Sequence, residues 1–130
     1  MADRTFTPIT LGADVPPPAG PYSPAVRAGD FVYVSGQVPR DPRTGDLVGS
    51  TIEDQSRSTL ANLRRVLEAA NASMRDVVSV TVYLVDENEW GAFNEVYKTF
   101  FEAPYPARAV IGASLRGIRV EISAIAYAPR

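Results

Sequence analysis

The sequence predicts an α+β two-layer sandwich in which two helices cover one face of a mixed β-sheet. Two segments carry apolar residues at helical spacing, and several shorter segments between them are rich in β-branched and aromatic residues. The chain has 130 residues, 45% of them hydrophobic, which is large enough for one hydrophobic core and too short for two. We therefore expect residues 1–130 to form a single domain.

The first half of the chain predicts a β-hairpin followed by a long helix. Residues 25–27 and 31–37 are rich in aromatic and β-branched residues and flank a glycine-containing turn, so they should pair as two strands. Residues 50–70 then carry an apolar stripe at helical spacing, and this stripe predicts packing against a sheet. Ser50 is the expected N-cap, because Glu53 follows at the spacing of a capping box.

The second half predicts a buried strand, a second helix and a final pair of strands. Residues 77–85 form a β-branched run typical of a buried strand, and Asp86 provides an N-cap for the helix that follows. The apolar face of that helix consists of Trp90, Phe93, Tyr97, Phe100 and Phe101. Residues 107–115 and 119–127 should form an antiparallel hairpin around a tight turn. Two helices cover only one face of such a sheet, so the other, partly apolar face favours a homo-oligomer.

The composition excludes several kinds of chemistry. The chain has no cysteine and no histidine, which thiolate nucleophiles, disulfides, Ser-His-Asp relays and the usual zinc sites require, so we expect no metal site. A net charge of −2 favours a small metabolite over nucleic acid or an anionic membrane as the partner. The sequence contains neither a long apolar run nor the features of a secretory signal, and we therefore expect a cytoplasmic protein.

Arg108 and Glu121 are the first candidates for chemistry, because each lies in an otherwise apolar predicted strand. In the two plausible registers of the expected hairpin, both side chains point to the same face of the sheet, whereas a bulge would separate them. Such a pair can bind a substrate carboxylate through the guanidinium and position water through the glutamate. Spacing alone favours the other interpretation, a structural ion pair or two solvated side chains.

Tyr22, Ser35, Gly36 and Asn94 are weaker candidates. Tyr22, Ser35 and Gly36 provide hydroxyls and flexible backbone beside predicted strands, which suits close approach to a ligand but is also ordinary at loops and strand ends. Asn94 is a polar amide on or near the aromatic face of the second helix. A satisfied core or interface amide is its more common explanation.

Five short motifs occur in order along the chain. They are Gly20-Pro21-Tyr22-Ser23, Tyr33-Val34-Ser35-Gly36-Gln37, Asn94-Glu95-Val96-Tyr97, Pro106-Ala107-Arg108 and Val120-Glu121-Ile122. Each is short, but together and at these spacings they resemble the RidA (YjgF, reactive intermediate deaminase) family. The similarity extends from residue 18 to residue 126.

The resemblance implies a chorismate-mutase-like fold and a homotrimer with ligand clefts between its subunits. It also implies hydrolysis of reactive 2-enamine and 2-imine acids, such as 2-aminoacrylate, to 2-keto acids and ammonia without a cofactor. In this family's pattern Arg108 binds the substrate carboxylate, and Glu121 orients the attacking water or transfers its proton. The cleft would be lined by Tyr22, Ser35, Gly36 and Asn94, part of it from the neighbouring subunit.

Two positions depart from the family's pattern. Val110 stands where many members carry cysteine, so its side chain would narrow and dry the pocket while its backbone groups line it. The turn at Leu115-Arg116-Gly117 is shorter than in the type protein and lacks its Leu-Pro step, which changes the rim of the cleft. The alternative function is a non-catalytic trimer that binds keto acids as a regulator or scavenger, whereas nuclease activity fits poorly with the acidic balance.

Overall fold

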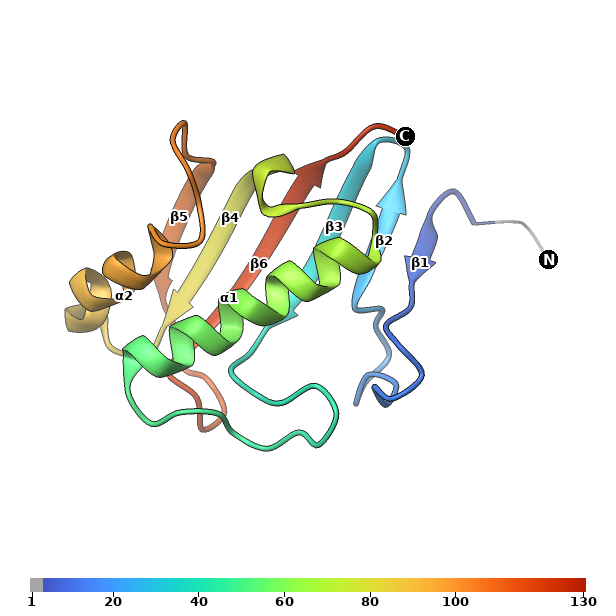
Figure 1. The fold of residues 1–130 in the computed structure, drawn as a ribbon. Helices are drawn as coiled ribbons and strands as arrows, with labels where there is room; N and C mark the ends of the chain where they lie inside the picture. The colour runs from blue at the N-terminus through green and yellow to red at the C-terminus, as the bar shows by residue number, and fades with distance from the viewer. Residues whose placement is uncertain (1–3) are drawn as a thin grey trace.

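The computed structural model describes residues 4–130, in which a mixed six-stranded sheet carries two helices on one face (Figure 1). The strands are β1 (Thr7–Ile9), β2 (Ala25–Ala28), β3 (Phe31–Gln37), β4 (Val77–Leu84), β5 (Ala107–Gly112) and β6 (Val120–Tyr127), and the helices are α1 (Ile52–Ala69) and α2 (Trp90–Tyr97). The strand order across the sheet is β1-β2-β3-β6-β4-β5. The predicted α+β arrangement with a mixed sheet is confirmed.

The β2–β3 hairpin and α1 form where the sequence predicts them. The hairpin closes between Ala28 and Phe31, and Gly29 adopts the positive φ of 59° that a two-residue turn needs. The N-cap of α1 is Thr51, whose hydroxyl accepts a hydrogen bond from the Asp54 amide at 3.1 Å. The prediction of Ser50 was wrong by one residue, because adjacent Ser and Thr are both good caps and the sequence does not choose between them.

The second helix begins later than predicted. Asp86 caps a 3₁₀ turn, Glu87–Glu89, by accepting a hydrogen bond from the Asn88 amide at 2.9 Å, and α2 follows directly at Trp90. The helix ends at Tyr97, so Phe100 and Phe101 lie beyond it. Among residues 4–130, no helix combines the length and the hydropathy that crossing a membrane requires.

The last two strands do not form the predicted hairpin. β5 lies at the sheet edge and pairs in parallel with β4, whereas β6 lies between β3 and β4 and is antiparallel to both. An alternating pattern indicates a half-buried strand but does not identify its neighbours. As a central strand, β6 buries four apolar side chains, Val120, Ile122, Ala124 and Ala126, each at most 4% exposed.

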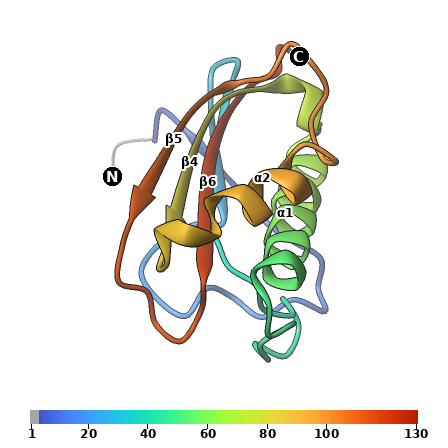
Figure 2. The same cartoon turned by 90° about the vertical axis from the view of Figure 1, so that its left-hand side faces the viewer.

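Both helices lie on the same side of the sheet, and the opposite side is uncovered (Figure 2). The core between the layers joins leucines of α1 to the inward-facing valines and isoleucine of the central strands. The uncovered face carries the exposed rings of Phe31, Tyr33 and Tyr127, with the centres of Phe31 and Tyr127 5.2 Å apart. This face is therefore partly aromatic and is not covered by the rest of the described chain.

Arg27 is a buried arginine that joins the end of α1 to the C-terminal segment. Its two terminal nitrogens donate to the carbonyl oxygens of Ala128 and Ala70, each at 2.8 Å. The whole residue is only 4% exposed. Ala70 is the C-cap of α1, so the positive charge also lies at the negative end of the helix dipole. The guanidinium thus satisfies two carbonyls that have no access to water.

Replacing this arginine with an apolar side chain should destabilise the fold. Arg27→Met leaves both carbonyls unpaired, and we expect the free energy of unfolding to fall by about 3 kcal/mol. Urea unfolding at one fixed protein concentration measures the difference. The control is Arg75→Met on the exposed surface, for which we expect a change within about 0.5 kcal/mol. Equal stability of the two variants would contradict the role assigned to Arg27.

Candidate functional site

Arg108 lies on the edge strand β5 and points to the helix-covered face of the sheet. Its partner across the parallel ladder is Val80, which is buried beneath the helices. The guanidinium carbon lies 4.7 Å from the ring centre of Tyr97 and 6.0 Å from those of Trp90 and Phe93. No carboxylate within residues 4–130 forms an ion pair with it. Its N–H donors are therefore available to a ligand.

The face of α2 that contacts Arg108 also carries Asn94. Trp90, Asn94 and Tyr97 follow the three- and four-residue spacing that places side chains on one helical face. The hydroxyl of Tyr97 and the Oδ1 atom of Asn94 are both buried, and neither has a hydrogen-bond partner in the part of the chain that the structure describes. Burial raises the pKa of Tyr97 and the charge of Arg108 lowers it to a smaller extent, so the phenol is neutral at neutral pH.

Val110 follows on the same face of β5 and is half-buried against the core. It is paired with Val82, which is fully buried, so its side chain packs inward. We call Arg108, Val110, Asn94 and the three aromatic residues of α2 the arginine half-site. It combines a free guanidinium with an apolar floor, an arrangement suited to a small carboxylate.

Glu121 lies on β6 and points to the uncovered face of the sheet. Its neighbours in sequence, Val120 and Ile122, are fully buried on the other face, and its partner on β4 is Tyr83. The carboxylate lies directly over Gly36, where an added Cβ would come within 2.8 Å of the Glu121 Cδ atom. Glycine at position 36 therefore provides the space that this carboxylate occupies.

Ser35, which precedes Gly36 on β3, is bonded to the loop that carries Tyr22. Its hydroxyl donates to the carbonyl of Ser23 at 2.6 Å, and its amide donates to the carbonyl of Pro24 at 3.0 Å. Tyr22 itself is 57% exposed. A recess of about 320 Å³ beneath the proline-rich loop includes both Tyr22 and Gly36 in its lining. We call Tyr22, Ser35, Gly36 and Glu121 the glutamate half-site.

The two half-sites lie on opposite faces of the same sheet. Arg108 shares the face of Val80 and Val82, whereas Glu121 is paired with Tyr83 on the other face, and β4 lies between the two strands. The expectation that Arg108 and Glu121 share a face was wrong, because it assumed a direct β5–β6 hairpin. A structural ion pair between them within one chain is excluded as well. One small ligand cannot touch both residues of the same chain.

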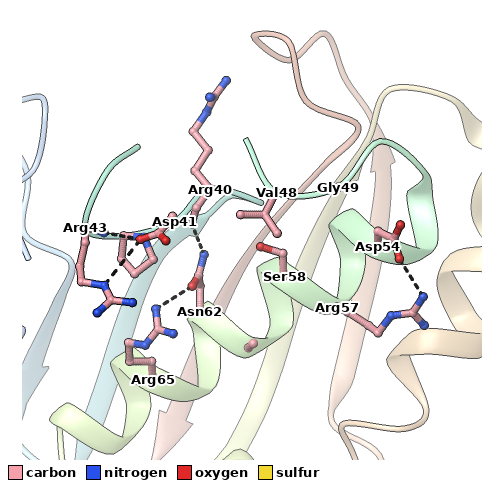
Figure 3. Close-up of a pocket in the computed structure, with 12 residues that line it drawn as sticks. Arg40, Asp41, Arg43, Val48, Gly49, Asp54, Arg57, Ser58, Asn62 and Arg65 are labelled. Carbon is pink, nitrogen blue, oxygen red and sulfur yellow. Dashed lines mark hydrogen bonds and ion pairs between the residues drawn. The ribbon is translucent and has the colours of Figure 1, made fainter. Parts of the chain in front are cut away.

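An adjoining recess of about 560 Å³, which shares Asn62 and Arg65 with the first, lies between α1 and the loop before it (Figure 3). Arg57 pairs with Asp54 at 3.1 Å, and Arg65 donates to the Oδ1 atom of Asn62 at 3.0 Å. Arg43 lies near Asp41 at 3.9 Å, and Arg40 extends away from the other side chains. None of the candidate residues from the sequence lines this recess. Its arginines are largely occupied by partners within the chain, unlike Arg108.

Comparison with known proteins identifies the family. The family model described as Endoribonuclease L-PSP matches residues 12–128. The chain belongs to this family, which is also called YjgF/RidA.

Relatives in the L-PSP family cover nearly the whole chain. A RutC family protein of Pyrococcus horikoshii is 46% identical over 121 residues, which span 92% of this chain and 96% of the relative. The mouse protein named 2-iminobutanoate/2-iminopropanoate deaminase is 45% identical over 113 residues, 85% of this chain and 84% of its own. The crystal structure of E. coli TdcF with bound serine superposes with a TM-score of 0.84 at 35% identity, covering 93% of this chain and 98% of TdcF. Several relatives that are 39% to 45% identical carry the deaminase name.

The aromatic contacts of Arg108 in this L-PSP chain are the part of the site that the sequence analysis missed. Trp90, Phe93 and Tyr97 had the spacing of a core-facing stripe and were interpreted only as packing. The available signal was the order strand, helix, strand, because a helix that connects two parallel strands lies over their sheet. A β4–α2–β5 crossover would have placed this aromatic face beside Arg108.

The contact between Gly36 and Glu121 gives a structural prediction for this L-PSP chain. A methyl group at position 36 overlaps the Glu121 side chain, so in Gly36→Ala we expect the carboxylate to rotate away from β3 while the fold is retained. A crystal structure of the variant measures the displacement. The control is Gly91→Ala, where no atom lies within 4 Å of the added Cβ and Glu121 should not move. An unmoved Glu121 in Gly36→Ala would contradict the close approach described above.

Proposed function

We propose that this protein hydrolyses 2-imino acids and their 2-enamine tautomers, such as 2-aminoacrylate, to 2-keto acids and ammonia. The observation that carries the proposal is the unpaired guanidinium of Arg108, held over an apolar floor at the sheet edge. A planar guanidinium can bind a substrate carboxylate through two parallel hydrogen bonds. The relatives named as imine deaminases support the reaction class.

The reaction needs orientation more than it needs a strong nucleophile. The imine carbon is already electrophilic, so the oxygen of water adds to it while the imine nitrogen takes up a proton. The resulting carbinolamine then loses ammonia as its C–N bond breaks and the C=O bond of the keto acid forms. Glu121 can accept the proton of the attacking water and pass it to the leaving nitrogen, and Arg108 fixes the carboxylate. No histidine, cysteine or cofactor is required for these steps.

We further propose that the working site combines half-sites from two copies of the chain in a homotrimer. Arg108 and Glu121 of one chain face away from each other, so a single chain offers a ligand only one of them. The uncovered sheet face with Phe31, Tyr33 and Tyr127 is an apolar surface that a neighbouring copy can cover. The serine bound in the TdcF structure has a carboxylate, the kind of group that we propose Arg108 binds in this chain.

A trimer that binds 2-keto acids without turnover is the second candidate. The arginine half-site is sufficient for binding a carboxylate, and this property does not depend on Glu121. Binding of 2-ketobutyrate in a calorimeter, with no acceleration of imine hydrolysis, would favour this function. RNA cleavage, which the family description mentions, is not favoured by a chain with a net charge of −2.

The proposed reaction is tested by coupling the purified protein to a serine or threonine dehydratase and following the release of keto acid. We expect the wild type to accelerate release, and Arg108→Ala to lower kcat/KM about 100-fold, because the carboxylate loses a charge-assisted pair of hydrogen bonds. Arg108→Lys should retain part of the activity, since lysine keeps the charge but not the fork. No acceleration by the wild type, or an unimpaired Arg108→Ala protein, would refute the proposal.

The composite site is tested by mixing two inactive variants. Arg108→Ala and Glu121→Gln chains are co-expressed with different tags, and mixed trimers are purified through both tags. An interface is active when its arginine comes from the Glu121→Gln copy and its glutamate from the Arg108→Ala copy. Every trimer that carries both tags then has a single active interface, so activity should return at about a third of the interfaces. The matched control mixes the Arg108→Ala,Glu121→Gln double variant with Arg108→Ala, which provides no intact arginine and should stay inactive. Failure of the mixed variants to regain activity would exclude a site shared between copies.

A further inference from the structure

We propose that Tyr97, together with Trp90 and Phe93, is a positioning residue that holds Arg108 ready for a carboxylate by taking the place of an acidic counter-ion. The inference rests on the proposed function of Arg108 as the residue that binds the substrate carboxylate. It assigns a role to aromatic side chains that touch the arginine and not the substrate. The ring of Tyr97 makes the shortest contact, at 4.7 Å, and the other two rings lie at 6.0 Å.

Among residues 4–130, Arg108 is the arginine whose guanidinium lies over three aromatic rings, whereas Arg64 lies over a single ring, that of Phe100, at 5.3 Å. Arg57 and Arg119 lie 3.1 Å and 3.3 Å from carboxylate oxygens, and Arg27 donates to two backbone carbonyls. A protein carboxylate beside Arg108 would occupy the N–H donors that a ligand needs. It would thereby compete with the carboxylate of the ligand for the guanidinium. An aromatic ring attracts the cation through its face and leaves the N–H edge of the guanidinium open.

The ring of Tyr97 is itself fixed by its neighbours. Its centre lies 5.6 Å from that of Phe93 and 4.6 Å from that of Phe101, and all three residues are at most 6% exposed. Arg108 therefore rests on a floor that belongs to the core. A long side chain that is ordered before the ligand arrives loses less conformational entropy on binding, which strengthens binding without adding a contact to the ligand.

The hydroxyl of Tyr97 gives a way to separate this role from simple packing. It is buried and has no hydrogen-bond partner within residues 4–130, so Tyr97→Phe removes nothing that the fold uses. Truncation to leucine would open a cavity and could unfold the chain for reasons unrelated to Arg108. Fluorination of the ring at position 97 avoids this problem, because it withdraws electron density from the ring face and nearly preserves the shape.

The experiment introduces a graded series at position 97 by stop-codon suppression. The series consists of phenylalanine and its mono-, di- and trifluorinated analogues in the full-length protein. Binding of 2-ketobutyrate is measured by calorimetry and by fluorescence of Trp90, which is the single tryptophan of the sequence and lies beside Arg108. Phenylalanine at position 97 is the reference of the series, and relative to it we expect each fluorine to weaken binding further, to about 10-fold overall.

The control places the same fluorinated phenylalanines at position 101. Phe101 stacks on Tyr97 but is not among the rings that contact Arg108, so affinity should stay constant across that series. Thermal unfolding of each variant is recorded alongside, and we expect it to be unchanged along the fluorine series.

The outcomes distinguish the inference from the function on which it rests. A Kd that rises with fluorine number at position 97 and not at position 101 supports it. A constant Kd at position 97, with binding abolished in Arg108→Ala, overturns the positioning role and leaves the proposed function intact. Binding of 2-ketobutyrate by Arg108→Ala as strong as by the wild type overturns both.

Discussion

The parallel pairing of β4 with β5 is the constraint on which the arrangement of the site depends. Parallel neighbours require a crossover connection, and here α2 makes the crossover above the sheet. This connection brings the aromatic face of α2 over the edge strand that carries Arg108. It also leaves β6 in the centre of the sheet, where the pleat turns Glu121 to the uncovered face. One topological choice therefore determines the surroundings of both charged residues.

The same choice leaves each chain with two incomplete charged sites. A partly buried charge without a partner is unfavourable, and the cation–π contacts compensate Arg108 only in part. Glu121 has no arginine or lysine partner among residues 4–130, and its carboxylate occupies the space beside Gly36. A ligand or a second copy that satisfies these charges would bind the folded state alone and stabilise it by mass action. In the proposed composite site, assembly, ligand binding and stability would therefore be linked through the same two residues.

The sequence predicts the local elements well and their neighbours poorly. The β2–β3 hairpin, α1 and β4 depend on periodicity and turn residues that are read within a few positions. The position of β6 in the sheet depends on which strands pair with its two edges. The alternation of apolar and polar residues along β6 does not identify those strands. The short strand β1 was missed because its three residues, Thr7–Ile9, are too few to show a period. The candidate site follows the same division. Motifs selected the candidate residues, but only the topology shows that they separate into two groups on opposite faces of the sheet.

The segment between β5 and β6 is held in place by the contacts of Arg119. The backbone amide of Arg119 donates to Gln55 at 2.8 Å, its Nε donates to the carbonyl of Ser50 at 2.9 Å, and its guanidinium lies 3.3 Å from Glu89. These contacts connect the turn to the start of α1 and to the segment before α2. Val110 packs toward the core, so it belongs to the floor of the arginine half-site and not to its charged rim. In the proposed site, selectivity among small acids would then come from the shape of the walls that Val110 and the Arg119 contacts fix.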